Sequence, residues 1–519
     1  MDKRVIIAVI LSMGVLLLYP YALKKIYPPK PAQTQAVKEA EKQAPSAPTE
    51  RAKDAKQLPA PIKEEFTTVD TPLFTAVFTN NGGAVRKWEL KKYEQTLNKD
   101  GRPINLADTV SRGSLKTVLE VRGSSEPVLF TPSKTGIALK DGEKAELIFT
   151  GVKDGLRIEK RYTFSGDSYI FNTEVNVANI SAKPVQGKVS TLMVASVAGK
   201  DTTGFHTGPI IKANGKLIRL TEKESQKNGA EPPKWIGIED KYFLSVLIPS
   251  KEPQLAWSGE VASSISSNAS IGVPFDLAPG AKAGLSYNAF LGPKEYDLLL
   301  EQKIGLEEAI EFGMFALLAK PFLVVLNFFE RYLGNYGLAI LVLTVITKVI
   351  FYPLSKHSLN SMNEMKKIQP QLVAIKEKYK GNKEKMNKEL MELYKRYKVN
   401  PVSGCLPMVL QIPVFIALYE VLYVAIELRH APFFLWIKDL SDKDPYYITP
   451  LIMGATMFIQ QKMTPTSVDP TQAKMMLIMP VVFTFMFLNF PSGLVIYWLV
   501  NNVLSIAQQY YIQRAPAKA

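Results

Sequence analysis

Hydrophobic and polar positions divide the 519-residue chain into stretches of different periodicity. Between residues 62 and 290, apolar and polar residues alternate in short runs. Such runs lie at residues 117–121, 145–150, 169–177 and 188–193. Turn residues such as Asn81-Gly82-Gly83 separate them, and alternation bounded by turns is typical of antiparallel strands. We therefore predict a large all-β sandwich over residues 62–290.

A second pattern consists of apolar stretches close to the length that crosses a membrane. They lie at residues 1–23, 333–355, 405–429, 446–463, 475–490 and 494–510. We predict a multidomain membrane protein with a polytopic α-helical bundle of six transmembrane helices. In the first stretch, Lys3 and Arg4 precede the apolar run, and no small-residue cleavage site directly follows it. This favours a retained anchor over a cleaved signal peptide.

Two connecting segments have patterns of their own. Residues 24–61 hold seven prolines among polar residues, which predicts a disordered tether. Residues 291–332 are predicted to be an interfacial amphipathic region. Within this region, residues 293–312 resemble one surface helix, and the apolar residues 313–329 are interrupted at Lys320-Pro321.

Charge orients these elements across the membrane. The net charge is +15, and residues 356–404 hold 12 basic and five acidic residues. Basic flanking segments stay on the cytoplasmic side, so residues 356–404, the N-terminus and the tail 511–519 are predicted to be cytoplasmic. The β-domain and residues 430–445 then lie outside. A further span at 313–329 would reverse this order, so that stretch is placed in the outer interface. The mean hydropathy of +0.01 averages a polar outer half and an apolar membrane half.

The basic segment 356–404 carries apolar residues every three or four positions, with a break at Gly381-Asn382. This pattern predicts an antiparallel helical hairpin with one apolar seam. Its lysine-rich faces suggest a docking site for an acidic or RNA-rich partner such as a ribosome. The candidate docking residues are Lys366, Lys367, Lys376, Lys378, Lys380, Lys383, Lys385 and Lys388. Positive-inside topology with affinity for anionic lipid is the alternative interpretation.

Lys348 is the most informative residue of the membrane half. A cation inside a spanning helix costs about 2.5–3.5 kcal/mol. Lys348 either extends to the inner interface or faces a water-filled cavity, and Thr344 and Thr347 favour a polar face. Further polar residues could line the same cavity. They are Gln411, Glu420, Thr456, Gln460, Gln461, Thr484, Asn501, Asn502 and Ser505. The difference in depth between Glu420 and Lys348 argues against an ion pair.

Composition excludes several classes of site. One cysteine and three separated histidines exclude an internal disulfide framework and disfavour a metal centre. No nucleotide-binding or hydrolase motif is present in the β-domain, and His206 is interpreted as a loop residue. We expect no cofactor and no catalytic residue. Two rival functions are an ion or solute transporter that uses Lys348 and Glu420, and a membrane-anchored carbohydrate enzyme.

Residues 330–515 closely resemble the YidC family of membrane protein insertases. The motifs that carry the resemblance lie at residues 348–354 (KVIFYPL), 397–407 (YKVNPVSGCLP), 411–415 (QIPVF), 427–429 (ELR), 431–440 (APFFLWIKDL), 444–447 (DPYY) and 490–494 (FPSGL). The anchor, the tether and the large outer domain are similar to those of Gram-negative members. The resemblance implies a five-helix core around a hydrophilic groove, and a periplasmic supersandwich related to sugar-mutarotase folds.

The resemblance also implies roles for particular residues. Lys348 occupies the position of the groove's positive residue, which is usually arginine in the family. Gln411 corresponds to a residue that lines the groove, and Tyr497 and Trp498 match an aromatic pair expected to contact substrate. Family membership implies insertion and folding of nascent membrane proteins in the cell inner membrane, alone or with the Sec translocon. The implied partners are the ribosome, the signal-recognition targeting machinery and the lipid bilayer.

Overall fold

The structure is a computed structural model of the chain. It describes residues 64–97, 101–108, 113–196, 205–229, 231–250, 254–263, 266–397, 399, 406–463 and 470–514. All of the described residues lie within Glu64–Ala519, which forms one compact unit. The predicted anchor 1–23, the tether 24–61 and the tail residues 515–519 lie outside the described residues.

The strands all lie between Phe66 and Pro293. They are β1 (Phe66–Asp70), β2 (Phe74–Thr79), β3 (Ala84–Glu94), β4 (Pro103–Asn105), β5 (Lys116–Val121), β6 (Ser124–Pro127), β7 (Thr131–Pro132), β8 (Gly136–Ala138), β9 (Lys144–Lys153), β10 (Leu156–Ser165), β11 (Ile170–Asn179), β12 (Val185–Ser196), β13 (Gly208–Ala213), β14 (Lys216–Arg219), β15 (Gln226–Gly229), β16 (Trp235–Glu239), β17 (Phe243–Pro249), β18 (Ala256–Ser263), β19 (Ser266–Leu277) and β20 (Lys282–Pro293). A 3-10 turn, η1 (Leu106–Asp108), follows β4.

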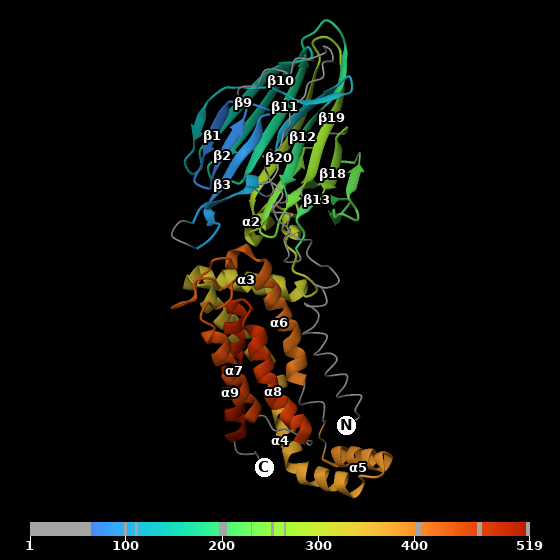
Figure 1. The fold of residues 1–519 in the computed structure, drawn as a ribbon, viewed down its shortest axis with the longest axis vertical. Coiled ribbons are helices and arrows are strands. Elements are labelled where there is room, and N and C mark those ends of the chain that lie inside the picture. The colour runs from blue at the N-terminus through green and yellow to red at the C-terminus, as the bar shows by residue number, and fades with distance from the viewer. Residues whose placement is uncertain are drawn as a thin grey trace, which may run out of the picture. The chain divides into compact units, whose positions relative to one another are not determined.

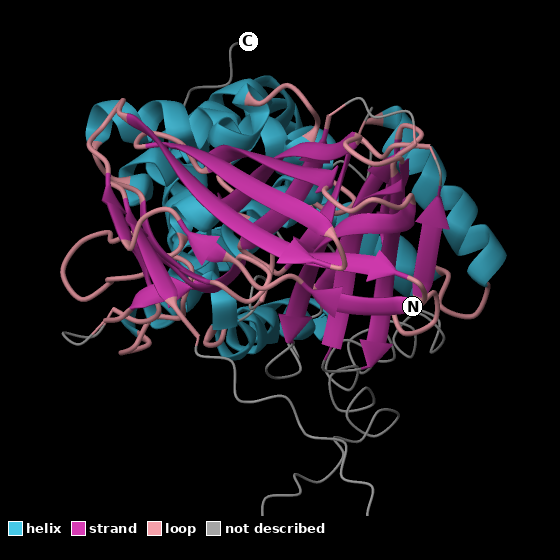
Figure 2. Ribbon diagram, turned by 90° about the horizontal axis from the view of Figure 1, so that it is seen from above, coloured by secondary structure: helices cyan, strands magenta, loops and turns pink. Residues whose placement is uncertain are grey.

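These strands form three sheets in the described residues (Figures 1 and 2). Their strand orders are β4-β3-β2-β1-β8, β14-β13-β16-β17-β20-β11-β10-β9-β7 and β15-β18-β19-β12-β5-β6. Paired strands are antiparallel except β1 and β8. The four runs predicted from alternation coincide with β5, β9, β11 and β12, which confirms a sheet-rich region. Burial alternates along β10, as expected for a strand with one face on the core.

Aromatic residues dominate the core between the sheets. Phe74 stacks on Trp88 with ring centroids 4.2 Å apart, and Phe78 lies 4.9 Å from Tyr162. All four are almost completely buried. Large rings remove much apolar surface from water, so these contacts contribute strongly to the stability of this region.

The helices follow β20. They are α2 (Tyr296–Glu301), η2 (Leu306–Ala309), α3 (Ala316–Leu333), α4 (Tyr336–Lys378), α5 (Lys383–Arg396), α6 (Leu406–Val424), η4 (Ile426–Leu428), α7 (Ile448–Met463), α8 (Pro470–Phe487) and α9 (Ser492–Arg514). Among the described residues, α4 alone is both long and apolar enough to cross a membrane, and Gln411–Val424 and Met476–Phe487 are shorter apolar helices. The count of six transmembrane helices therefore stays a prediction.

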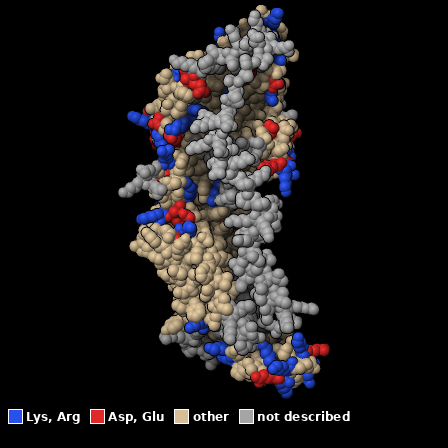
Figure 3. All heavy atoms as spheres, viewed as in Figure 1, with Lys and Arg blue, Asp and Glu red and all other residues tan. Residues whose placement is uncertain are grey.

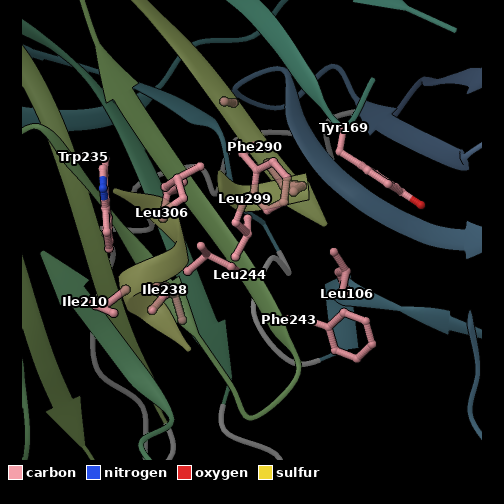
Figure 4. Close-up of a cluster of buried hydrophobic side chains, with 14 of the residues drawn as sticks. Leu106, Tyr169, Ile210, Trp235, Ile238, Phe243, Leu244, Phe290, Leu299 and Leu306 are labelled. Atoms are coloured by element: carbon pink, nitrogen blue, oxygen red, sulfur yellow. The ribbon is translucent and has the colours of Figure 1, made fainter. Parts of the chain in front are cut away.

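The prediction of one surface helix over residues 293–312 is wrong. α2 has only six residues, and Gly305 then adopts a φ of +77° before η2 begins. Leu299 and Leu306 are buried beside strand residues such as Leu244 (Figure 4). The apolar residues that suggested an amphipathic surface helix instead complete the core of the strand-rich region.

The predicted interruption at Lys320-Pro321 is also wrong, because α3 runs through it. Pro321 lies near the start of α3, where its missing N–H removes a single helical hydrogen bond. Leu323 and Leu326 beyond it are completely buried. Packing of this face offsets the lost bond and holds α3 together.

α4 joins the span predicted at 333–355 to the first part of the hairpin predicted at 356–404. It continues through residue 355 and contains Pro353 and Pro370, so the first arm of the hairpin is the second half of α4. The predicted break at Gly381-Asn382 is confirmed, and α5 forms the second arm. The predicted apolar seam is present as a small separate core. Its buried members are Met365, Ile368, Leu372, Leu393 and Val399.

Candidate functional site

Lys348 lies on α4 and reaches across to α9. Asn335 caps the start of α4 by accepting a hydrogen bond from the backbone N–H of Leu338 at 3.1 Å. The Nζ of Lys348 donates to the Oγ of Ser505 at 2.6 Å. Within the part of the chain that the structure describes, no carboxylate pairs with Lys348. A hydroxyl group therefore solvates this ammonium without neutralising it.

Ser505 connects Lys348 to a polar seam between α7 and α9, made of Thr456, Asn501, Asn502 and Ser505. The Oγ of Ser505 donates to the carbonyl of Asn501 at 2.7 Å. The Nδ2 of Asn502 donates to the Oγ1 of Thr456 at 3.2 Å. Polar groups from α4, α7 and α9 thus meet within the helical bundle.

Three glutamine side chains carry further hydrogen-bond donors on α7 and α9. The Nε2 atoms of Gln461, Gln508 and Gln509 are buried and have no hydrogen-bond partner among the described residues. A buried donor without a partner costs roughly 1–3 kcal/mol. These amides are therefore suited to a ligand or water that supplies oxygen acceptors.

Thr344 contributes less to this polar face than its position suggests. Its side chain is completely buried, and its Oγ1 donates to the carbonyl of Ile340 at 2.7 Å. Thr347 donates in the same way to the carbonyl of Thr344 at 2.8 Å. Both hydroxyl protons are used within α4, so these residues offer acceptors only.

Gln411 and Tyr497 form a second polar contact, between α6 and α9. The Nε2 of Gln411 donates to the hydroxyl of Tyr497, whose side chain is completely buried. Trp498 is partly buried, and its ring centroid lies 4.9 Å from Phe415 and 5.2 Å from Phe487. Tyr497 and Trp498 thus have different environments, and only Trp498 retains exposed surface.

The predicted groove residues therefore fall into two groups. Lys348 contacts Ser505, whereas Gln411 contacts Tyr497, and no hydrogen bond joins the two groups within the described residues. Ser505 is absent from the groove residues assigned by the family motifs. Its signal is the spacing of Asn501 and Ser505, which places two polar residues on one face of an apolar helix.

Glu420 contacts α3 and not Lys348. The backbone N–H groups of Met314 and Phe315, just before α3, point at its carboxylate. Gly313 lies so close that a Cβ built on it would be 2.1 Å from the Oε1 of Glu420. A direct ion pair between Glu420 and Lys348, which the sequence disfavours, is absent from the described contacts.

The candidate docking lysines gather on the hairpin of α4 and α5, where Figure 3 shows a cluster of basic atoms. All are exposed except Lys376, which is partly buried. Lys367 forms an ion pair with Glu364 at 2.6 Å. Lys378 and Lys385 both approach the ring of Tyr379, at 5.5 and 5.4 Å from its centroid. Their charges lie at the surface, where a partner can reach them.

The strand-rich region holds a buried charge cluster that the sequence did not reveal. Glu239 is 1% exposed and contacts Lys294 at 2.5 Å, Arg219 at 2.7 Å and His206 at 2.9 Å. His206 also bonds to the carbonyl of Leu220 at 2.8 Å, so it is more than a loop residue. Burial opposes ionisation of Glu239, but Lys294, the hydrogen bond from His206 and Arg219 outweigh it and hold its pKa at about 2. Both carboxylate oxygens are occupied, which points to a structural role.

No group of three His, Cys, Asp or Glu residues is placed to hold a metal ion in the described part of the chain.

Comparison with known proteins covers nearly the whole chain. The family model for the YidC periplasmic domain matches residues 67–325, and the model for the 60Kd inner membrane protein matches residues 328–519. The membrane protein insertase YidC of Syntrophus aciditrophicus is 44% identical over 542 residues, covering 99% of this chain and all of the relative. The chain belongs to the YidC family of membrane protein insertases. The YidC of Geobacter sulfurreducens is 45% identical over 540 residues, covering 100% and 99% of the two chains.

Solved structures give weaker similarity. A crystal structure of an active YidC insertase is 20% identical, with a TM-score of 0.40 over 86% of this chain and 95% of the other. A galactose mutarotase-like protein from Lactobacillus casei is 10% identical, with a TM-score of 0.32 over 44% and 100% of the two chains. The family model that matches residues 328–519 is described as an inner membrane protein. The relatives are named membrane protein insertases. The chain thus belongs to a family whose members are named for the insertion of membrane proteins.

Proposed function

We propose that this protein inserts and helps fold nascent membrane proteins in the inner membrane, alone or with the Sec translocon. The insertion site is a hydrophilic groove that holds Lys348. The ribosome and the signal-recognition targeting machinery deliver the substrate to the hairpin of α4 and α5. The contact between Lys348 and Ser505 carries this proposal, because it places an unneutralised cation on a seam of polar side chains.

The energetics of crossing explain why such a seam is useful. A polar tail that enters hydrocarbon without hydrogen bonds costs several kcal/mol per group. Unpaired donors on Gln461, Gln508 and Gln509 supply partners for its carbonyl groups. Lys348 attracts acidic side chains on the tail transiently. The apolar segment then partitions into lipid, and this burial drives the step without a nucleotide.

The topology that fits this mechanism has six spans, with both termini in the cytoplasm and the strand-rich region outside. Support comes from the positive charge of residues 356–404. α3 then lies in the outer interface. Its exposed apolar face supports this placement: Met314 beside its start is 83% exposed, Leu317 is 88% exposed and Tyr332 is 75% exposed.

Charge reversal at Lys348 tests the proposal. Lys348→Glu is expected to lower insertion of a single-span substrate with an acidic tail by roughly tenfold or more, because repulsion replaces attraction. Lys348→Arg keeps the charge and is expected to insert normally. The assay measures protease protection of the tail in proteoliposomes. Unchanged insertion by Lys348→Glu would reject the electrostatic role.

A substrate with a neutral tail provides the matched control. It still needs the polar seam but gains nothing from attraction to Lys348. Lys348→Glu should therefore impair the acidic-tail substrate more than the neutral one. Equal losses for both substrates would show that the substitution damages the bundle and does not act through charge.

A further inference from the structure

Residues 296–333, which we name the strap, connect the last strand to α4. The strap contains α2, η2 and α3. Figure 1 shows α3 crossing one end of the helical bundle, and α3 packs on α4 and α6. A segment in this position decides whether the outer end of the groove is covered. What holds the strap in place is therefore relevant to insertion.

The first contact lies where α3 begins. Glu420 on α6 faces the backbone N–H groups of Met314 and Phe315, which precede the first residue of α3. Gly313 has a φ of +61°, and any Cβ there would meet the Oε1 of Glu420 at 2.1 Å. Gly313 is thus the residue that allows the carboxylate to approach the backbone so closely.

The second contact lies at the start of α2. The Oε1 of Glu427 in η4 accepts a hydrogen bond from the backbone N–H of Tyr296 at 2.7 Å. Its Oε2 is buried without a partner among the described residues. Glu427 follows Glu420 by seven residues, so carboxylates from one short stretch of chain contact both helical starts of the strap. Hydrogen bonds between a carboxylate and backbone N–H groups are stronger than neutral ones.

The residues beside Tyr296 connect the strap to other elements. Glu295 pairs with Lys92 on β3 at 2.6 Å. Asp297 pairs with Arg331 on α3 at 2.7 Å and accepts from Asn327 at 3.3 Å. The start of α2 is therefore fixed to the strand-rich region, to α3 and to η4 at once. Movement of any one of these elements acts on the same few residues.

We propose that Glu420 and Glu427 are positioning residues for insertion, which hold the strap across the outer end of the bundle and close the groove on that side. This inference rests on the proposed function. The carboxylates contact neither the seam nor substrate. They act through α3, whose placement keeps the polar seam from opening to the outside.

Hydrogen exchange of the full-length protein in lipid nanodiscs tests the docking. Glu420→Leu is expected to speed exchange of the amides at 314 and 315 roughly tenfold, and Glu427→Leu that of the amide at 296. Glu420→Gln and Glu427→Gln keep one acceptor oxygen and should restore most of the protection. Glu301→Leu is the matched control, because Glu301 is exposed at the end of α2. Unchanged exchange in both leucine variants would overturn the proposal.

The same variants are then assayed for insertion and for leakage. Glu420→Leu together with Glu427→Leu is expected to reduce insertion severalfold and to admit a membrane-impermeant thiol reagent, applied from outside, to Ser505→Cys. Faster strap exchange with normal insertion and no labelling would overturn the role in closing the groove. Failure of Lys348→Glu to alter insertion would instead reject the role of Lys348 in the proposed function, and would leave the exchange result intact.

Gly313→Ala provides an independent variant at the same contact. Its Cβ and the positive φ should displace the start of α3 and speed exchange at 314 and 315 as strongly as Glu420→Leu. Because both changes break one contact, the double variant should exchange no faster than the stronger single variant. Additive effects would contradict a shared contact.

Discussion

Glu239 in the strand-rich region and Lys348 in the helical region are both charges in surroundings that penalise charge. Glu239 is almost fully buried, and the side chains of Lys294, Arg219 and His206 all contact its carboxylate. Lys348 has a single hydroxyl partner, Ser505. A buried charge with all of its partners present contributes to the folded structure, whereas a charge without a counterion remains available to a passing substrate. Substitutions at the two positions should therefore affect different measurements.

The largest effect is expected from Glu239→Leu. Removing the carboxylate leaves Lys294 and Arg219 without their counterion, and breaking a buried pair in this way costs about 3–5 kcal/mol. The thermal midpoint of the full-length protein in detergent, followed by tryptophan fluorescence, should fall by roughly 10 °C. Glu159→Leu removes a partly exposed partner of Arg161 and should change stability by less than about 1 kcal/mol. Equal falls in the thermal midpoint for Glu239→Leu and Glu159→Leu would contradict the structural role assigned to Glu239.

Acid should act through the same carboxylate. The pKa of Glu239 is about 2 in the fold, against an ordinary value of 4.5, so the unfolded chain binds the proton first as the pH falls. Its contribution, on the order of 3 kcal/mol, is complete above about pH 4.5 and is lost as the pH falls towards 2. Thermal midpoints at pH 7, 5 and 3.5 measure this loss. The thermal midpoint of Glu239→Gln should depend less on pH than that of the unmodified protein. An identical pH dependence would contradict the assignment of this loss to Glu239.

Lys348→Met should reverse the pattern seen at Glu239. An apolar side chain of similar length removes the cost of a charge within the bundle, so stability should stay unchanged or rise slightly. Insertion of the acidic-tail substrate should fall by roughly tenfold, because the attraction to the tail is lost. The two quantities are measured on the same preparation. A large drop in thermal midpoint would show that Lys348 is as structural as Glu239.

The smallest effect is expected at the hairpin, where charges are exposed and screened. Lys380→Glu with Lys388→Glu should weaken ribosome binding about three- to tenfold at low salt, and less at high salt. Cosedimentation with ribosomes measures the change. Lys282→Glu, an exposed substitution in the strand-rich region, is the control. Loss of binding to anionic vesicles with unchanged ribosome binding would favour the lipid interpretation.

The sequence predicted elements wherever periodicity and turns agreed, as in β5, β9, β11 and β12 and in the hairpin seam. The prediction was wrong where apolar residues pack against a distant part of the chain. Leu299 and Leu306 look like one side of an amphipathic helix, yet they fill the core beside the sheet. Periodicity reports which residues avoid water but not what covers them.

The sequence also did not predict the buried polar contacts. Lys160 lies on β10 among inward-facing residues, and its Nζ donates to the carbonyls of Gly82 and Gly83, both at 3.3 Å. Partners almost eighty residues away give no local signal. The same reason hid the contacts of Glu239 and of Glu420, whereas Lys348 was visible because a single charge interrupts an apolar stretch.

The unbroken course of α4 has a mechanical consequence. From Lys348 to its end at Lys378, the helix rises about 45 Å. Pro353 lacks the N–H that would bond to the carbonyl of Val349, so the backbone is most easily bent just beyond Lys348. A bend of roughly 10° there would move the far end of α4 by about 6 Å. Because α4 is continuous, a force applied to the hairpin would be transmitted along this helix to the surroundings of Lys348.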